Sequence, residues 1–154
     1  MSRAAVRRIL HPSDFSPASR AAFAKAIELA RDNRAELLVL HVRGAVAPVI
    51  GDDYISPQAY ESIERASREE TRRQLSRLVE QARRRGVRVR ALMAQGTAHD
   101  EILRAARRGK VDMIVMGTHG RTGLARFFIG SVASRVVAQA TCPVLTVRGR
   151  ARSR

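Results

Sequence analysis

The sequence predicts an α/β protein with one open, five-stranded parallel sheet and helices on both faces. Short apolar runs alternate with longer amphipathic segments along the 154 residues, and the series begins and ends with a strand. Two of the runs, Leu37–Leu40 and Met113–Met116, are apolar at every position, which is typical of strands covered on both faces. Strands that alternate with helices in this way form parallel sheets through crossover connections.

The first half of the chain contains two predicted strands, each followed by a helix. They are a strand at 6–10, a helix from 17 to about 31, a strand at 36–42 and a helix from 57 to about 85. We expect His11-Pro12 to end the first strand. Ser16-Pro17 and Ser56-Pro57 each place a capping hydroxyl before a proline at the first helical position. Gly86 ends the long helix.

The long helix is rich in arginine, and many of these arginines follow an acid by one helical turn. Pairs four residues apart with the acid first stabilise an exposed helix face. The sequence offers Glu64/Arg68, Glu69/Arg73 and Glu80/Arg84. This pattern predicts a solvated face, while the run 83–85 stays open as a candidate site for an anionic partner.

The second half of the chain contains three predicted strands and two helices. They are a strand at 87–94, a helix from 97 or 98 to 106, a strand at 113–116, a helix at 131–140 and a strand at 143–147. The first of these strands begins with alternating polar residues, which predicts a sheet edge. In the last helix we expect one buried stripe, made of Val132, Val136, Val137 and Ala140.

Composition limits the classes of protein to which the chain can belong. The formal net charge is +15, which fits a nucleic-acid partner, but the arginines are spread over the whole chain and favour a generally basic surface. No apolar run reaches the length of about eighteen residues that a membrane-spanning helix needs. The single cysteine, Cys142, excludes an internal disulfide, so we expect a reducing compartment and place the protein in the cytoplasm.

A glycine-rich segment follows the fourth predicted strand. Gly117 and Gly120 are separated by two residues, and nine residues later Gly130-Ser131 opens the last helix. Glycine lets the backbone approach a phosphate closely, and the free N–H groups of a helix start favour anionic oxygens. Each glycine alone could equally serve only a turn. In open parallel sheets ligands bind beyond the carboxyl ends of strands, so we expect this segment to meet the loop at 12–16. The dinucleotide fingerprint and the Walker A pattern are absent.

The spacing Gly-x2-Gly-x9-Gly-Ser resembles the ATP-binding signature of the universal stress protein family. The opening ILHPSDFSPAS and the ending CPVLTV resemble the first and last strands of that family, so the resemblance covers nearly the whole chain. It implies an adenine-nucleotide alpha-hydrolase-like fold with the flavodoxin-like strand order 3-2-1-4-5, in one domain over residues 1–147. We expect residues 148–154 to form a basic, disordered tail.

The resemblance also implies which residues hold the nucleotide. Pro12, Ser13 and Asp14 would lie beside the adenosine, and the backbone of Val42 would meet the adenine. Met116 and Gly117 would line the nucleotide, and the phosphates would be held by Gly120, Gly130, Ser131 and Val132. The sequence departs from the family at His11, where an apolar residue is usual.

Several of these residues have a second interpretation. Asp14 could instead complement the positive end of the following helix. Arg121 could add a charge-assisted contact to the phosphates or be an exposed cation of the loop. His119 could meet the phosphates, but we expect it to face solvent. The histidines have no metal-ligand spacing.

Three functions follow from this sequence. The first, which the resemblance implies, is an ATP-binding regulator of the stress response that would take Mg²⁺ or Mn²⁺ with the triphosphate. Members of the family commonly form homodimers, and the strand at 143–147 is the candidate pairing edge. The second is a slow ATPase or nucleotidyl transferase, for which Asp14 and His119 are the available bases and no catalytic residue is assigned. The third is a basic nucleic-acid binder that uses the long helix and the tail.

Overall fold

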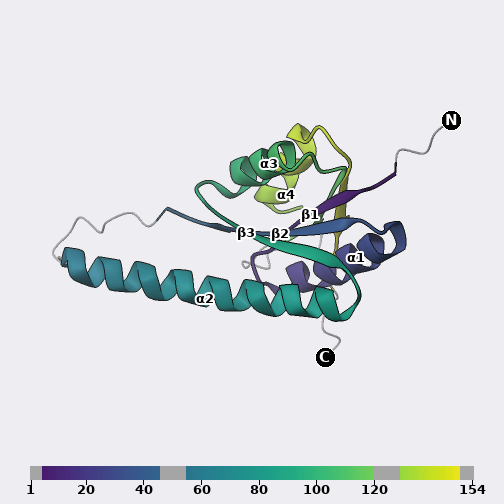
Figure 1. The fold of residues 1–154 in the computed structure, drawn as a ribbon. Helices are drawn as coiled ribbons and strands as arrows, with labels where there is room; N and C mark the ends of the chain where they lie inside the picture. The colour runs from purple at the N-terminus through teal and green to yellow at the C-terminus, as the bar shows by residue number, and fades with distance from the viewer. Residues whose placement is uncertain (1–4, 46–54, 120–128, 150–154) are drawn as a thin grey trace, which may run out of the picture.

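The computed structural model describes residues 5–45, 55–119 and 129–149, and its strands form one parallel sheet (Figure 1). The strands are β1 Arg8–Pro12, β2 Glu36–Arg43, β3 Arg88–Gln95, β4 Met113–Gly117 and β5 Val144–Val147. Their order is β3-β2-β1-β4-β5, which confirms the predicted fold class and strand order. β3 lies at one edge of the sheet, as predicted, and β5 lies at the other.

Helices cover both faces of this sheet. In the described residues they are α1 Pro17–Asn33, α2 Pro57–Arg84, α3 Ala98–Arg108 and α4 Ser131–Gln139. On one face, Phe23 of α1 and Leu75 of α2 pack against strand residues such as Val39. On the other, Ile102 of α3 and Val136 of α4 pack against residues such as Leu38. Figure 1 shows the two helix pairs on opposite sides of the strands.

The prediction for the end of β1 is wrong, because the strand continues through His11 and Pro12. The backbone of Arg7 bonds to Glu36 of β2, and that of Ser13 bonds to Leu40 of β2. Successive residues of a strand direct their backbone groups to alternate sides, so the backbone of Pro12 faces β4 instead. In the hydrogen-bond ladder between β1 and β4, the carbonyl oxygen of Val115 needs a donor from this position. Pro12 cannot supply it, because proline has no N–H.

The imidazole of His11 supplies that missing donor. Its Nδ1 lies 2.9 Å from the carbonyl oxygen of Val115, so Nδ1 carries the proton and donates. The ring is fully buried and lies 5.3 Å from that of Phe23. Its Nε2 is buried with no hydrogen-bond partner among the described residues. Burial lowers the pKa of His11 to about 4, so the ring is neutral at neutral pH.

Helix α2 is held to the sheet by an ion pair that the sequence did not indicate. The helix has 28 residues, and three are buried: Thr71, Leu75 and Ala82. Glu64 does not pair with Arg68 but with Arg43 of β2, whose Nη2 lies 3.0 Å from Oε2 of Glu64. Both side chains are shielded, with 7% of Arg43 and 15% of Glu64 exposed.

Of the other predicted ion pairs of α2, one is confirmed and one is wrong. Arg84 and Glu80 form an ion pair at 3.1 Å, as expected from their spacing. Arg73 bonds to Glu70 at 3.1 Å rather than to Glu69. At both sites the arginines are well exposed, so these pairs contribute little to stability.

The buried stripe of α4 differs from the predicted one by one residue. Ala133 and Val136 are buried and Val132 is partly buried, whereas Val137 is 48% exposed. Val137 is turned by about 100° from Val136 around the helix and lies at the margin of the stripe, where it stays exposed.

The described residues contain no helix long and apolar enough to cross a membrane. The predicted tail begins at Arg148 and Gly149, and its remaining residues, 150–154, lie outside the described part of the chain.

Candidate functional site

A cavity of about 240 Å³ opens beyond the carboxyl ends of β1 and β4. The strand order makes these two strands neighbours, although the chain leaves β1 toward β2 and leaves β4 toward β5. This is the switch point at which ligands of open α/β sheets bind. The paired register of β1 and β4 ends at Leu10 and Ile114, so the two strands are unpaired at the mouth of the cavity.

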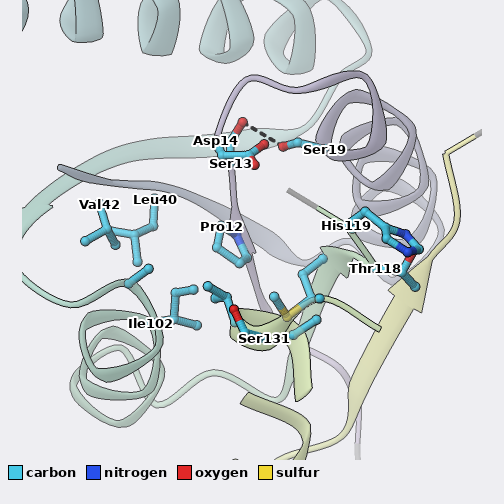
Figure 2. Close-up of a pocket in the computed structure, with 16 residues that line it drawn as sticks. Pro12, Ser13, Asp14, Ser19, Leu40, Val42, Ile102, Thr118, His119 and Ser131 are labelled. Atoms are coloured by element: carbon cyan, nitrogen blue, oxygen red, sulfur yellow. Dashed lines mark hydrogen bonds between the residues drawn. The ribbon is translucent and has the colours of Figure 1, made fainter. Parts of the chain in front are cut away.

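The loop after β1 forms one wall of the cavity and is fixed by short polar contacts. Oδ1 of Asp14 accepts a bond of 2.9 Å from the N–H of Ser16, and the hydroxyl of Ser13 bonds to that of Ser19 at 2.9 Å. Ser16 in turn caps α1, accepting from the N–H of Ser19 at 3.1 Å, as the sequence predicted. Figure 2 shows Ser13, Asp14 and Ser19 together on this side of the cavity.

His41 of β2 contacts the same loop through a hydrogen bond and a stacked ring. Its Nδ1 donates to the carbonyl oxygen of Ser13 at 2.7 Å, and its ring stacks on Phe15 with 4.5 Å between centroids. Phe15 has a φ of 63°, a conformation that costs energy for a bulky side chain. The stacking therefore helps to hold a strained turn, and with it the neighbouring Asp14, in place.

Gly117 brings β4 close to the start of α1. A Cβ atom at this position would lie 3.1 Å from the carbonyl carbon of Ala18 and 3.2 Å from its oxygen. Both are backbone atoms that cannot move independently of the helix. The structure thus gives Gly117 a packing role, in addition to its place on the cavity wall.

We expect Gly117→Ala to destabilise the protein by about 1 to 3 kcal/mol, because the added methyl group overpacks the start of α1. Urea unfolding followed by circular dichroism measures this loss. Gly44→Ala is the matched control, since a Cβ at Gly44 meets nothing within 4 Å. Equal unfolding midpoints for the two variants would show that the contact with Ala18 is relaxed in solution.

The N-terminus of α4 forms the opposite wall. Gly130 is the N-cap residue, and its N–H donates to the carbonyl oxygen of Thr118 at 2.6 Å. Among the described residues no side chain caps the helix, and Ser131 occupies the first helical position. The first N–H groups of α4 and the positive end of its dipole therefore face the cavity, with no side-chain acceptor among the described residues.

The structure brings most of the predicted site residues to this one cavity. Those on its wall are Pro12, Ser13, Asp14, Val42, Met116, Gly117, Gly130, Ser131 and Val132. Gly120 and Arg121 lie outside the described residues. His119 also lines the cavity, contrary to the expectation that it faces solvent, and its Nδ1 lies 2.8 Å from the hydroxyl of Thr118.

The sequence did not identify two residues of the apolar part of the wall, Leu40 and Ile102. Leu40 ends the buried stretch of β2, and Ile102 comes from α3 (Figure 2). With Val42 and Met116 they form an apolar surface that lies across from the polar loop. Leu40 was detectable as a residue near the end of a buried strand, whereas Ile102 looks like any other core position of an amphipathic helix.

The cavity carries little acidic charge of its own. Among the described residues of its wall, Asp14 is the carboxylate. No group of three or more histidine, cysteine or acidic side chains in the described parts of the chain could hold a metal ion. The arrangement combines an apolar surface, one carboxylate and an uncapped helix start, which is suited to a ligand with an apolar ring and an anionic end.

Comparison with known proteins agrees with this geometry. The model of the universal stress protein family matches residues 5–148. The chain belongs to this family. Universal stress protein MJ0531 of Methanocaldococcus jannaschii is 37% identical over 92% of the chain and 82% of its own length. Universal stress protein YxiE of Bacillus subtilis is 34% identical over 92% of the chain and 98% of its own length.

Solved structures of universal stress proteins share the fold. The structure of protein MJ0577 of M. jannaschii superposes with a TM-score of 0.84 at 26% identity, over 97% of this chain and 100% of that one. An Arabidopsis thaliana family member, solved with AMP bound, superposes with a TM-score of 0.68 at 24% identity, over 94% of this chain and 93% of that one. At that identity the second likeness is evidence for the fold alone.

Proposed function

We propose that this universal stress protein binds ATP in the cavity between β1 and β4 and acts as a nucleotide-dependent regulator. The observation that carries the proposal is the position of the uncapped α4 N-terminus directly across the switch point from Asp14. Backbone N–H groups at a helix start bind phosphate, and a nearby carboxylate can accept bonds from ribose hydroxyls.

We infer a place for each part of the nucleotide from the chemistry of the cavity walls. The adenine would lie against Val42, Leu40 and Ile102, whose side chains form the apolar surface. The ribose would lie near Pro12 and Asp14. The phosphates would extend toward Gly130 and Ser131, where the helix dipole and the serine hydroxyl favour negative charge. The Arabidopsis protein of the same fold was solved with AMP bound, so this fold can hold an adenine nucleotide.

The divalent cation is proposed to enter with the triphosphate rather than to occupy a site of its own. Asp14 is the described carboxylate on the cavity wall, and one carboxylate with phosphate oxygens is a usual arrangement for Mg²⁺. The metal would neutralise charge on the phosphates. The residues fit such shared coordination and do not fit a cage made by the protein alone.

The homodimer is proposed to form through β5. This strand is an edge, and Val144–Val147 are all partly exposed. An unpaired edge of apolar residues is a template for pairing with a second chain. Sedimentation equilibrium with and without ATP would measure whether the dimer forms and whether the nucleotide changes it.

We expect Gly130→Val to reduce ATP affinity at least about a hundredfold, equivalent to about 2.7 kcal/mol. The valine side chain would occupy the space at the α4 N-terminus. The backbone of Gly130, at φ −59° and ψ 156°, is one that valine adopts without strain, so the fold should persist. Isothermal titration calorimetry with Mg²⁺–ATP measures the loss.

Gly44→Val is the control for this experiment, because Gly44 does not line the cavity and a Cβ there meets nothing within 4 Å. It should bind ATP as the wild type does. Unchanged ATP affinity in a folded Gly130→Val protein would exclude the site. Mass spectrometry of the ligand released from the purified protein would identify a nucleotide that is retained through purification.

A further inference from the structure

A second concavity, which shares no lining residue with the nucleotide cavity, runs between α2 and the outer edge of β3. It has a volume of about 840 Å³. Figure 1 shows α2 lying along β3 and continuing beyond the strand. The floor of this groove is apolar and includes Val79 of α2 and Met93 of β3, which is 36% exposed. We call it the α2–β3 groove.

Among the described residues no strand pairs with the outer edge of β3, which lies along this groove. The N–H of Gly96 bonds to the carbonyl oxygen of Arg43, so the even-numbered residues of β3 direct their backbone toward β2. The odd-numbered ones, among them Ala91 and Met93, direct theirs outward. Both residues line the groove. An extended peptide could therefore continue the sheet at this edge, as in recognition by β-strand addition.

One stripe of α2 would face the side chains of such an added strand. Arg72, Ser76, Val79 and Arg83 all line the groove and follow helical spacing on one side of α2. Arg72 and Arg83 are eleven positions apart, or about 16 Å along the helix axis. On a strand, two residues four positions apart point to the same face and lie about 13 Å apart. The long arginine side chains can bridge the remaining distance of about 3 Å.

The charges of the stripe define the side chains that fit it. Arg72 and Arg83 are exposed, and neither forms an ion pair within the described residues. The acid nearest to them in the groove, Glu80, is already paired with Arg84 at 3.1 Å. Between the two arginines the stripe is uncharged, with Val79 at its apolar centre. The groove is therefore positive at both ends and apolar in the middle.

We propose that the α2–β3 groove binds an extended segment of a partner protein with the pattern acid-x-apolar-x-acid. The backbone of this segment pairs with the outward groups of Ala91 and Met93. Its two acidic side chains meet Arg72 and Arg83, and the apolar side chain between them lies on Val79. The interaction is independent of the nucleotide cavity and goes beyond the proposed ATP binding.

Fluorescence anisotropy with two labelled peptides tests the pattern. Thr-Glu-Thr-Val-Thr-Glu-Thr should bind the full-length protein, and Thr-Lys-Thr-Val-Thr-Lys-Thr should not. Arg72→Glu should weaken binding of the acidic peptide about tenfold or more, because the peptide then meets a like charge. Arg77→Glu is the matched control, since Arg77 is also exposed on α2 but does not line the groove, and it should change affinity much less.

Ala91→Pro separates strand addition from simple charge attraction. Proline is tolerated on an edge strand where the N–H faces outward, so the fold should persist while one backbone bond to the peptide is lost. Loss of binding in folded Ala91→Pro supports the proposal. Three results would overturn it: equal binding of both peptides, unchanged affinity of Ala91→Pro, or a wild-type dimer that Ala91→Pro converts to monomer.

A nucleic-acid surface is the alternative that DNA binding tests. If Arg72→Glu lost DNA and peptide binding equally while Ala91→Pro retained both, the proposal would be overturned and the groove would be a nucleic-acid surface.

Discussion

Replacing Arg43 by methionine should destabilise the protein by about 3 kcal/mol. The substitution leaves Glu64, which is 15% exposed, without its cation. Breaking a buried ion pair by removing one partner costs about 3 to 5 kcal/mol, because the remaining charge stays desolvated. Oε1 of Glu64 is buried with no hydrogen-bond partner in the described part of the chain, so that carboxylate has little other compensation. Thermal unfolding by circular dichroism should show a fall in Tm of roughly 6 to 12 °C.

The double variant Arg43→Met/Glu64→Leu distinguishes a lost charge partner from lost packing. A well-packed apolar pair is often as stable as a buried ion pair, so the double variant should recover most of the stability. Ser67, which also accepts from Arg43 at 3.3 Å, remains exposed to water and needs no replacement. A single variant as stable as the wild type would mean that α2 moves to expose Glu64, and the predicted cost would be wrong.

The stability of the protein should fall by about 3 kcal/mol between pH 6.5 and pH 4 because of His11. Its pKa is 6.5 in the unfolded chain and about 4 in the folded protein, where burial disfavours the charged ring. Between these two values the unfolded state binds more protons than the folded state. The free energy of unfolding therefore rises with pH across this window, and the contribution of His11 is fully present above pH 6.5.

Urea unfolding of the wild type and of His11→Leu at pH 7, 5.5 and 4 measures this contribution. Carboxylates add their own pH dependence to both proteins, so the difference between the two curves is the quantity of interest. His11→Leu should be less stable at pH 7, because the carbonyl of Val115 loses its donor, and should lose less stability on acidification. If the free energies of unfolding of the two proteins changed with pH in parallel, the His11 ring would not be protonated on unfolding in this range.

The fold could be predicted because every strand and helix has a local signal. Strands such as Leu37–Leu40 are apolar at each position, and Ser16-Pro17 marks the start of α1 in the sequence itself. The end of β1 could not be predicted in this way. His11-Pro12 looks like a strand end until the neighbouring β4 is known, since the acceptor that completes the ladder is the distant carbonyl of Val115.

The candidate site was predictable to a similar degree. The glycine spacing indicated Gly117 and Gly130, and the loop after β1 indicated Asp14. The contact that requires Gly117, with the backbone of Ala18, depends on how α1 packs over β4 and leaves no trace in the local sequence. The same holds for His41, which looks isolated in the chain but supports Ser13.

The pairing of β1 with β4 also has a consequence for the order of folding. Asp112 accepts bonds from the N–H groups of Arg7 and Arg8, and the first of these spans 105 residues of chain. The bond from His41 to Ser13 spans 28. Closing the longer loop costs roughly 1 kcal/mol more in chain entropy. The junction of β1 and β4, on which the candidate cavity depends, is thus the least local in the sheet. A ligand of this cavity would bind only chains in which β1 and β4 have already paired, and would therefore favour fully folded molecules.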